Sequence, residues 1–130
     1  MSANLDLVRS IYAKWERGDF SSAAWADRDI EYVSVDGPDP GSWKGLEGVA
    51  AVNRDFLSAW TDWRIVPESY RELDDMRVLV LTRRGGRGKR SGLGVFEPAA
   101  NLLHVRDGKV TRLVFYWDRD RALADLGLEQ

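Results

Sequence analysis

Apolar residues near the start of the chain recur three and four positions apart, which is the spacing of one helix face. This stripe predicts a helix over residues 4–17, with Asn4 available to cap its start and Gly18 to end it. Asp19 can cap a second, short helix that extends through Trp25. The N-terminal part of the chain is therefore expected to supply helices rather than strands.

A further apolar stripe predicts a third helix over residues 46–60. Before it, residues 29–35 have the composition of a short strand, and the segment GPDPG at 37–41 is rich in turn-forming residues. Asn53 interrupts the stripe of the third helix. It is either a polar group of a pocket or a residue bonded to a neighbouring loop.

The second half of the chain changes to the composition and two-residue period of β-strands. Strands are expected at residues 63–73, 77–84, 93–105 and 110–117, followed by a last helix at 119–126. Short turns join these strands, and Asp107-Gly108 is a strong turn dipeptide. Strands that follow one another through short turns pair antiparallel, so the pattern predicts an α+β protein with one domain over residues 1–130.

The last strand carries apolar residues on both faces. Leu113, Phe115 and Trp117 share one face, and Val110, Val114 and Tyr116 lie with Arg112 on the other. The first set is expected to face a cavity enclosed by the bent sheet. A subunit this small has no helix left to cover the second set, so a homodimer through the convex sheet face is expected.

Composition narrows the chemistry. The 130 residues carry a formal charge of -2, which gives no reason to expect a nucleic acid or an acidic membrane as a partner. The absence of cysteine excludes thiol chemistry, and one histidine cannot form a multi-histidine metal site. No apolar run is long enough for a membrane span, and the first residues do not resemble a signal peptide. A cytoplasmic protein without a metal or cofactor is expected.

Four segments carry a family resemblance: VRSIYAKWERGDF, ADRDIEYVS, WKGLEGVAAVNRDF and HVRDGKVTRLVFYWDRDRALADLGL. In this order they resemble the nuclear transport factor 2-like superfamily, and within it SnoaL-like and ketosteroid-isomerase-like proteins. The resemblance covers nearly the whole chain. It implies a cystatin-like α+β roll, in which a cone-shaped, strongly bent antiparallel sheet wraps around three N-terminal helices. Because the superfamily includes isomerases, cyclases, dehydratases, epoxide hydrolases and binding modules, the fold does not fix the function.

The resemblance also implies that the best-known catalytic sets of the superfamily are incomplete here. The first-strand base of ketosteroid isomerases falls at Val33, and their first-helix tyrosine falls near Ile11, beside Tyr12. The protonated aspartate of their oxyanion site falls at Asn101, whose amide could still donate a hydrogen bond to an oxyanion. The last-strand aspartate of limonene-epoxide-hydrolase-like members falls at Phe115. Neither chemistry is expected in its usual form.

Two glutamates are candidate bases for a cofactor-independent isomerase, cyclase or lyase. Glu31 has the parity of the family's base position, and Glu97 shares a strand face with Asn101. A carboxylate inside an apolar cone would have a raised pKa and could accept a proton, while Asn101 and Tyr12 or Tyr32 steady the oxyanion. If both glutamates instead face solvent, the protein is a ligand-binding or dimerisation module.

Aromatic residues from several segments are expected to meet inside the cone. They either line a small-molecule cavity or fill a core. The candidate ligand-binding residues are Tyr12, Trp15, Trp25, Tyr32, Asn53, Phe56, Trp60, Arg83, Leu103, Phe115 and Trp117. Arg83 lies inside a strand pattern and could hold a carboxylate or enolate at the pocket mouth. The expected ligand is a small apolar molecule, polycyclic or enolisable.

Two polar features are interpreted as structural. The run RRGGRGKR at 83–90 looks like an RNA-binding patch or a phosphate loop, but Arg90 stands where a serine or threonine should follow the lysine. A solvated hairpin tip is the simpler interpretation. His104, the only histidine, has the parity opposite to Asn101, which places it on the outer sheet face as a surface or interface residue.

Overall fold

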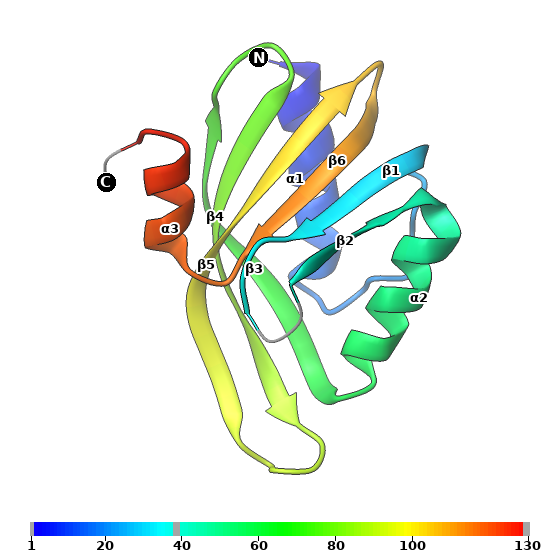
Figure 1. The fold of residues 1–130 in the computed structure, drawn as a ribbon, viewed down its shortest axis with the longest axis vertical. Coiled ribbons are helices and arrows are strands. Elements are labelled where there is room, and N and C mark those ends of the chain that lie inside the picture. Colours follow the sequence, from blue (N-terminus) through cyan, green and yellow to red (C-terminus); the bar gives the residue numbers. More distant parts are fainter. Residues whose placement is uncertain (1, 38–39, 129–130) are drawn as a thin grey trace.

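The computed structural model describes residues 2–37 and 40–128. Figure 1 shows the helices and strands in chain order. They are α1 (Ala3–Trp15), β1 (Ala26–Ser34), β2 (Gly41–Lys44), α2 (Gly45–Leu57), β3 (Trp60–Glu72), β4 (Arg77–Gly88), β5 (Gly94–Arg106), β6 (Lys109–Tyr116) and α3 (Arg119–Asp125). The α+β class and the bent sheet predicted from the sequence are confirmed. None of the described helices is long and apolar enough to cross a membrane.

The described strands form one sheet of six in the order β2-β1-β6-β5-β4-β3. The strands from β3 to β6 pair antiparallel through short turns, as expected. β1 pairs with β6 in parallel, so the sheet is mixed rather than fully antiparallel. Antiparallel pairing is expected only for strands joined by a short turn, and β1 and β6 are far apart in the sequence. β2, which the sequence analysis did not predict, pairs with β1 at the sheet edge.

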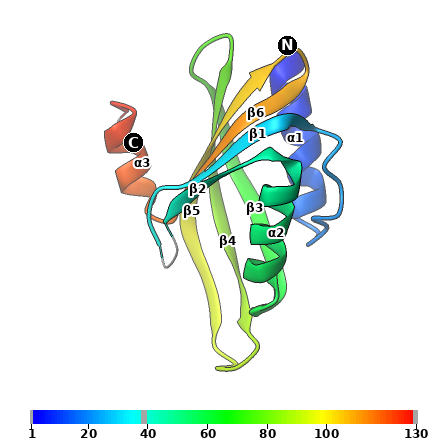
Figure 2. The ribbon, with the colours of Figure 1, turned by 45° about the vertical axis from the view of Figure 1, so that its right-hand side comes forward.

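Helices α1 and α2 lie on the same side of the sheet, on its concave face (Figure 2). The α1 residues Val8 and Ile11 are almost fully buried against Val80 of β4 and Leu103 of β5. Ser2 caps the start of α1, because its hydroxyl accepts a hydrogen bond from the backbone N–H of Leu5. The expected cap, Asn4, instead donates its side-chain amide to the Asp75 carbonyl.

The second N-terminal helix expected after Asp19 is absent. The chain from residue 19 to residue 25 is a loop, because local side-chain bonds compete with helix formation. The Asp19 carboxylate accepts hydrogen bonds from the backbone and hydroxyl of Ser21, and the Trp25 indole donates to the Ser22 carbonyl. The turn-rich segment expected at 37–41 lies partly outside the described residues, and its last residue begins β2.

Helix α3 covers the convex face of the sheet, on the side opposite α1 and α2 (Figure 2). Its residues Ala122 and Leu123 form a second buried cluster with Val114 and Tyr116 of β6. The premise that no helix covers this outer set is therefore wrong. Val110 also departs from the expected set, since it is buried in the concave core after a bulge between His104 and Val105.

Candidate functional site

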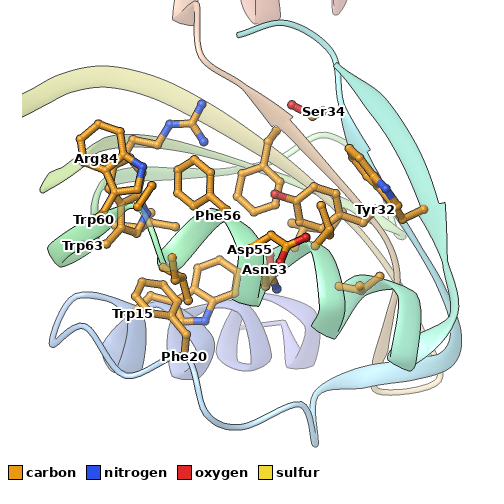
Figure 3. A pocket seen from close by; sticks show the side chains of 18 of the residues that line it. Trp15, Phe20, Tyr32, Ser34, Asn53, Asp55, Phe56, Trp60, Trp63 and Arg84 are labelled. Carbon is orange, nitrogen blue, oxygen red and sulfur yellow. The ribbon is translucent and has the colours of Figure 1, made fainter. Parts of the chain in front are cut away.

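A cavity of about 630 Å³ lies between α2, the loop after α1 and the concave face of the sheet. Figure 3 shows side chains from these elements pointing into a common space. Its aromatic lining residues are Trp15, Phe20, Trp25, Tyr32, Trp43, Phe56, Trp60, Trp63, Phe115 and Trp117. The polar ones are Ser34, Asn53, Asp55 and Arg84. This combination of many rings and few polar groups is typical of a small-molecule site.

Most of the residues expected to meet inside the cone do so. Those that border the cavity are Trp15, Trp25, Tyr32, Asn53, Phe56, Trp60, Phe115 and Trp117. Tyr12, Leu103 and Arg83 do not border it. Leu103 is fully buried in the core beneath α1, and Arg83 lies on the other side of its strand. The rings therefore form both a core and the wall of a cavity.

The rings of the cavity wall support one another. Phe56 of α2 lies edge-on to Trp63 of β3 at 4.8 Å between ring centroids, and its centroid is 6.1 Å from that of Trp117. On the other side, Trp15 of α1 stands edge-on to Trp25 at 5.6 Å. Rings held by such contacts keep their positions without a ligand, so little ordering is needed when one binds.

Two glycines permit this packing. A Cβ atom on Gly86 of β4 would lie 3.1 Å from the Cα atom and 3.2 Å from the ring of Trp63. A Cβ atom on Gly37 would lie within 2.4 Å of two atoms of the Trp117 indole, and its φ of +87° also favours glycine. Trp63 and Trp117 thus lie directly against backbone.

Arg84 of β4 brings a positive charge into this apolar site. Only 5% of the residue is exposed. Its guanidinium carbon lies 4.2 Å from the centre of the Trp117 ring and 5.7 Å from that of Phe115, which are cation–π distances. Burial lowers the pKa of Arg84 to about 10, although Tyr32, Asp36 and Tyr12 act in the opposite direction. At neutral pH the group is therefore charged and poorly solvated.

No carboxylate neutralises Arg84 among residues 2–37 and 40–128. None of the ion pairs in this part of the chain includes it, and its buried Nε and Nη2 atoms have no hydrogen-bond partner there. Asp36 is the acidic residue whose charge acts on it. The Asp36 carboxylate accepts hydrogen bonds from the backbone N–H groups of Trp117 and Asp118 instead.

Arg84, and not the predicted Arg83, is the arginine that borders the cavity, so the prediction was wrong by one residue. Along β4, Val78 and Val80 lie in the concave core, so the same alternation places Arg84 on the concave face and Arg83 on the convex one. Arg83 donates to the Phe96 carbonyl there. Because the run at 83–90 has the composition of a solvated hairpin tip, Arg84 was not predicted to lie in the cavity. The parity of Val78 and Val80 would have placed it there.

The proposed oxyanion pair lies behind the cavity. The Asn101 amide donates a hydrogen bond of 2.7 Å to the Tyr12 hydroxyl, and both side chains are fully buried. Burial strongly raises the pKa of Tyr12. Neither residue borders the cavity. The structure brings the pair together, but it does not present either group to a ligand.

Neither candidate base reaches the cavity. Glu31 forms an ion pair of 3.2 Å with Arg112 and shares its strand face with Val33, which packs in the convex cluster. Glu97 is exposed on β5, where this strand pairs with β4 but no longer with β6. The expected position of a glutamate beside Asn101 inside the cone is therefore wrong. Glu31 lies outside the cavity because β1 pairs in parallel with β6, which places Glu31 opposite Arg112.

His104 lies on the convex face, as its parity predicted. It pairs with Arg77 and Arg112 on the neighbouring strands. Burial, with these two arginines, lowers the pKa of His104. In the described part of the chain, no group of three or more histidine or acidic side chains is placed to hold a metal ion.

Solved structures share this fold. TerC, co-crystallised with polyporic acid, is 22% identical, with a TM-score of 0.76, and the match covers 96% of this chain and 98% of that one. A ketosteroid-isomerase-like protein from Catenulispora acidiphila, in complex with trimethylamine, is 18% identical, with a TM-score of 0.74 and coverage of 95% and 94%.

A protein from Jannaschia described as a SnoaL-like polyketide cyclase is 15% identical, with a TM-score of 0.76 and coverage of 98% and 94%. These identities show a common fold and no more. No curated protein matches the sequence significantly. The model of the SnoaL-like domain matches residues 8–113, which is most of the chain. The chain belongs to the SnoaL-like domain family.

Proposed function

We propose that this protein binds a small, largely apolar, ring-containing molecule in the cavity between α2 and the sheet. The observation that carries the proposal is the aromatic wall, whose rings already contact one another around a space of about 630 Å³. That volume suits a ligand of two to four fused or linked rings. The polar lining groups are few enough to orient such a ligand without making the site hydrophilic.

Binding is favoured over catalysis by the position of the carboxylates. An isomerase, cyclase or dehydratase of this fold needs a base in contact with its substrate. Glu31 and Glu97 lie away from the cavity. Asp55 is the one carboxylate among the described lining residues, and it is exposed on α2. We therefore propose a binding protein and not an enzyme.

Structures of the same fold support a small organic ligand. TerC was co-crystallised with polyporic acid, and the Catenulispora protein was crystallised with trimethylamine. Proteins described as polyketide cyclases share the fold as well. These relatives suggest the kind of molecule to screen, namely cyclic or polycyclic organic compounds.

Filling the cavity tests the proposal. Val52 borders the cavity from α2, whereas its neighbour Ala51 is exposed and does not border it. V52W should place an indole ring in the ligand space, and A51W should place the same ring in solvent. Fluorescence titration with the neutral probe N-phenylnaphthylamine should show saturable one-to-one binding to the unaltered protein and to A51W. V52W should bind roughly tenfold more weakly or worse.

Folding of each variant is checked by circular dichroism and thermal unfolding. Absence of saturable probe binding to the unaltered protein would contradict the proposal. Equal affinity of folded V52W and folded A51W would also contradict it, because the probe would then bind elsewhere.

A further inference from the structure

The guanidinium of Arg84 is a charge without a counterion in an apolar wall. Removing an arginine from water is costly unless its charge and its N–H groups find partners. Here only 5% of the residue is exposed, and two of its buried donor atoms have no partner among the described residues. Stacking on Trp117 compensates for only part of this loss. The site is therefore incomplete without an anion.

Groups of the protein near Arg84 do not supply that anion. Glu97 of β5 lies opposite Arg84 in the strand register, but it is exposed, forms no ion pair with Arg84 among the described residues, and its charge is not among those that act on Arg84. Asp36 is already engaged by the N–H groups of Trp117 and Asp118 at 2.6 Å and 3.2 Å. Asp55 borders the same cavity, but it forms no ion pair with Arg84, and its charge is not among those that act on Arg84. The cavity itself is the place from which an anion can come, because Arg84 borders it (Figure 3).

The shape of the site restricts the anion further. A guanidinium is planar and presents its donors as a fork, which matches a charge shared by oxygen atoms. The rings around it, Phe56, Phe115 and Trp117, provide flat apolar surfaces for the remainder of the ligand. A carboxylate or an ionised enol conjugated to a ring system satisfies both requirements. A compact inorganic anion satisfies only the first.

We propose that Arg84 is the specificity-determining residue of this cavity, and that its ligand is a planar ring compound carrying a delocalised oxyanion, either a carboxylate or an enolate. This inference rests on the proposed binding function and adds the charge of the ligand to it. The same charge disfavours amines and other cations in the cavity.

Matched probes test the inference on the unaltered protein. Naphthoate and naphthamide have the same ring and almost the same shape, but only naphthoate is charged. Naphthoate should bind about tenfold more tightly or better, as expected for a hydrogen-bonded charge pair in a poorly solvated site. Hydroxynaphthoquinone, which ionises as an enol, is the third probe. Whichever of the two anions binds more tightly identifies the source of the oxyanion.

Variants then assign the preference to Arg84. R84Q should reduce the affinity for the anionic probes about tenfold or more and leave that for naphthamide within about twofold. R83Q removes the same charge from the adjacent residue, which lies outside the cavity, and should leave all three affinities unchanged. R84M serves as a second variant if R84Q does not fold, since methionine can fill the same apolar space.

The outcomes separate this inference from the proposed function. If the unaltered protein binds none of the probes, N-phenylnaphthylamine included, the cavity is not a binding site. Tight binding of neutral probes with no preference for anions, or a preference that persists in folded R84Q, overturns the role of Arg84 alone.

Discussion

Burial acts in the same direction on the four tyrosines of the chain. It raises the pKa of Tyr32, on the cavity wall, to about 12, and it also raises the pKa of Tyr12, on the buried face of α1. The pKa values of Tyr70 and Tyr116 are also raised. A phenol that ionises later in the folded chain than in the unfolded one stabilises the fold below pH 10, about the ordinary tyrosine pKa, and this contribution is lost as the pH rises through the folded value.

An alkaline titration tests this effect. Ultraviolet absorbance of tyrosinate should rise later in the native protein than in the denatured chain, with most of the native change above pH 10. Y32F should remove the part of the native change that occurs near pH 12 and leave the remainder. Coincident titration curves of native and denatured protein would show that burial does not control these phenols.

Single positions also show where sequence reasoning reached its limit. Alternation correctly placed Asn101 and Leu103 on the concave side, because β5 is regular there. It failed for Glu31, whose face depends on a parallel pairing with β6 that no local pattern encodes. It failed for Arg84 because a glycine-rich, basic segment has the composition of a loop while the chain continues as strand.

Among the elements, side-chain hydrogen bonds decided the conformation of one segment, and close strand packing decided that of another. The loop at 19–25 has helix-compatible alanines, but Asp19 and Ser22 bind nearby groups that a helix would have needed. β4 continues to Gly88 because its glycines let β3 and β5 approach closely, where any side chain would collide with them. Both outcomes depend on contacts that are distant in sequence or specific to one conformation.

Gly86 of β4 lies in close contact with β3. A Cβ atom there would lie 2.9 Å from the Thr61 carbonyl and 3.1 Å from the Trp63 Cα, both on β3. G86A should therefore push β3 away, lower the free energy of unfolding by roughly 1–3 kcal/mol and weaken probe binding by moving Trp63. Gly94, at the start of β5, has nothing within 4 Å of the same position. G94A is the matched control.

Urea unfolding of the two variants measures the difference. G94A should be neutral or slightly stabilising, because alanine restricts the unfolded chain more than glycine does. Equal stability of G86A and G94A would mean that the contact between β3 and β4 adjusts without cost.

For the chain as a whole, the order of helices and strands predicted most of the fold correctly. The helical start, the meander and the final helix are all present, and the family resemblance supplied the bend of the sheet. What the sequence could not supply was the side of the sheet on which α3 lies. That side depends on the total packing of Leu123 and Val114, and it decides which apolar surface remains open.

The homodimer expected from the sequence stays a prediction, and α3 changes the surface it would use. Because α3 covers Val114 and Tyr116, a dimer through the convex face would have to contact α3 and the exposed Glu31–Arg112 ion pair. Exposed ion pairs contribute little to the fold, so the charge of Arg112 can be reversed with a small loss of stability.

Reversing the charge of Arg112 tests the dimer through the convex face. Light scattering at high micromolar concentration should give a dimer mass for the unaltered protein. R112E should shift the mass toward the monomer, because the altered charge and Glu31 make the patch negative, and a two-fold interface brings the same patch of both subunits together. Arg87 is exposed on the β4–β5 hairpin, which extends beyond α3 and β6 (Figure 1), so R87E carries the same charge change at a distance from Arg112 and should leave the dimer intact. A monomer mass for the unaltered protein would contradict the dimer, whereas dissociation by R87E alone would place the contact on the hairpin, where Leu93 and Phe96 are exposed.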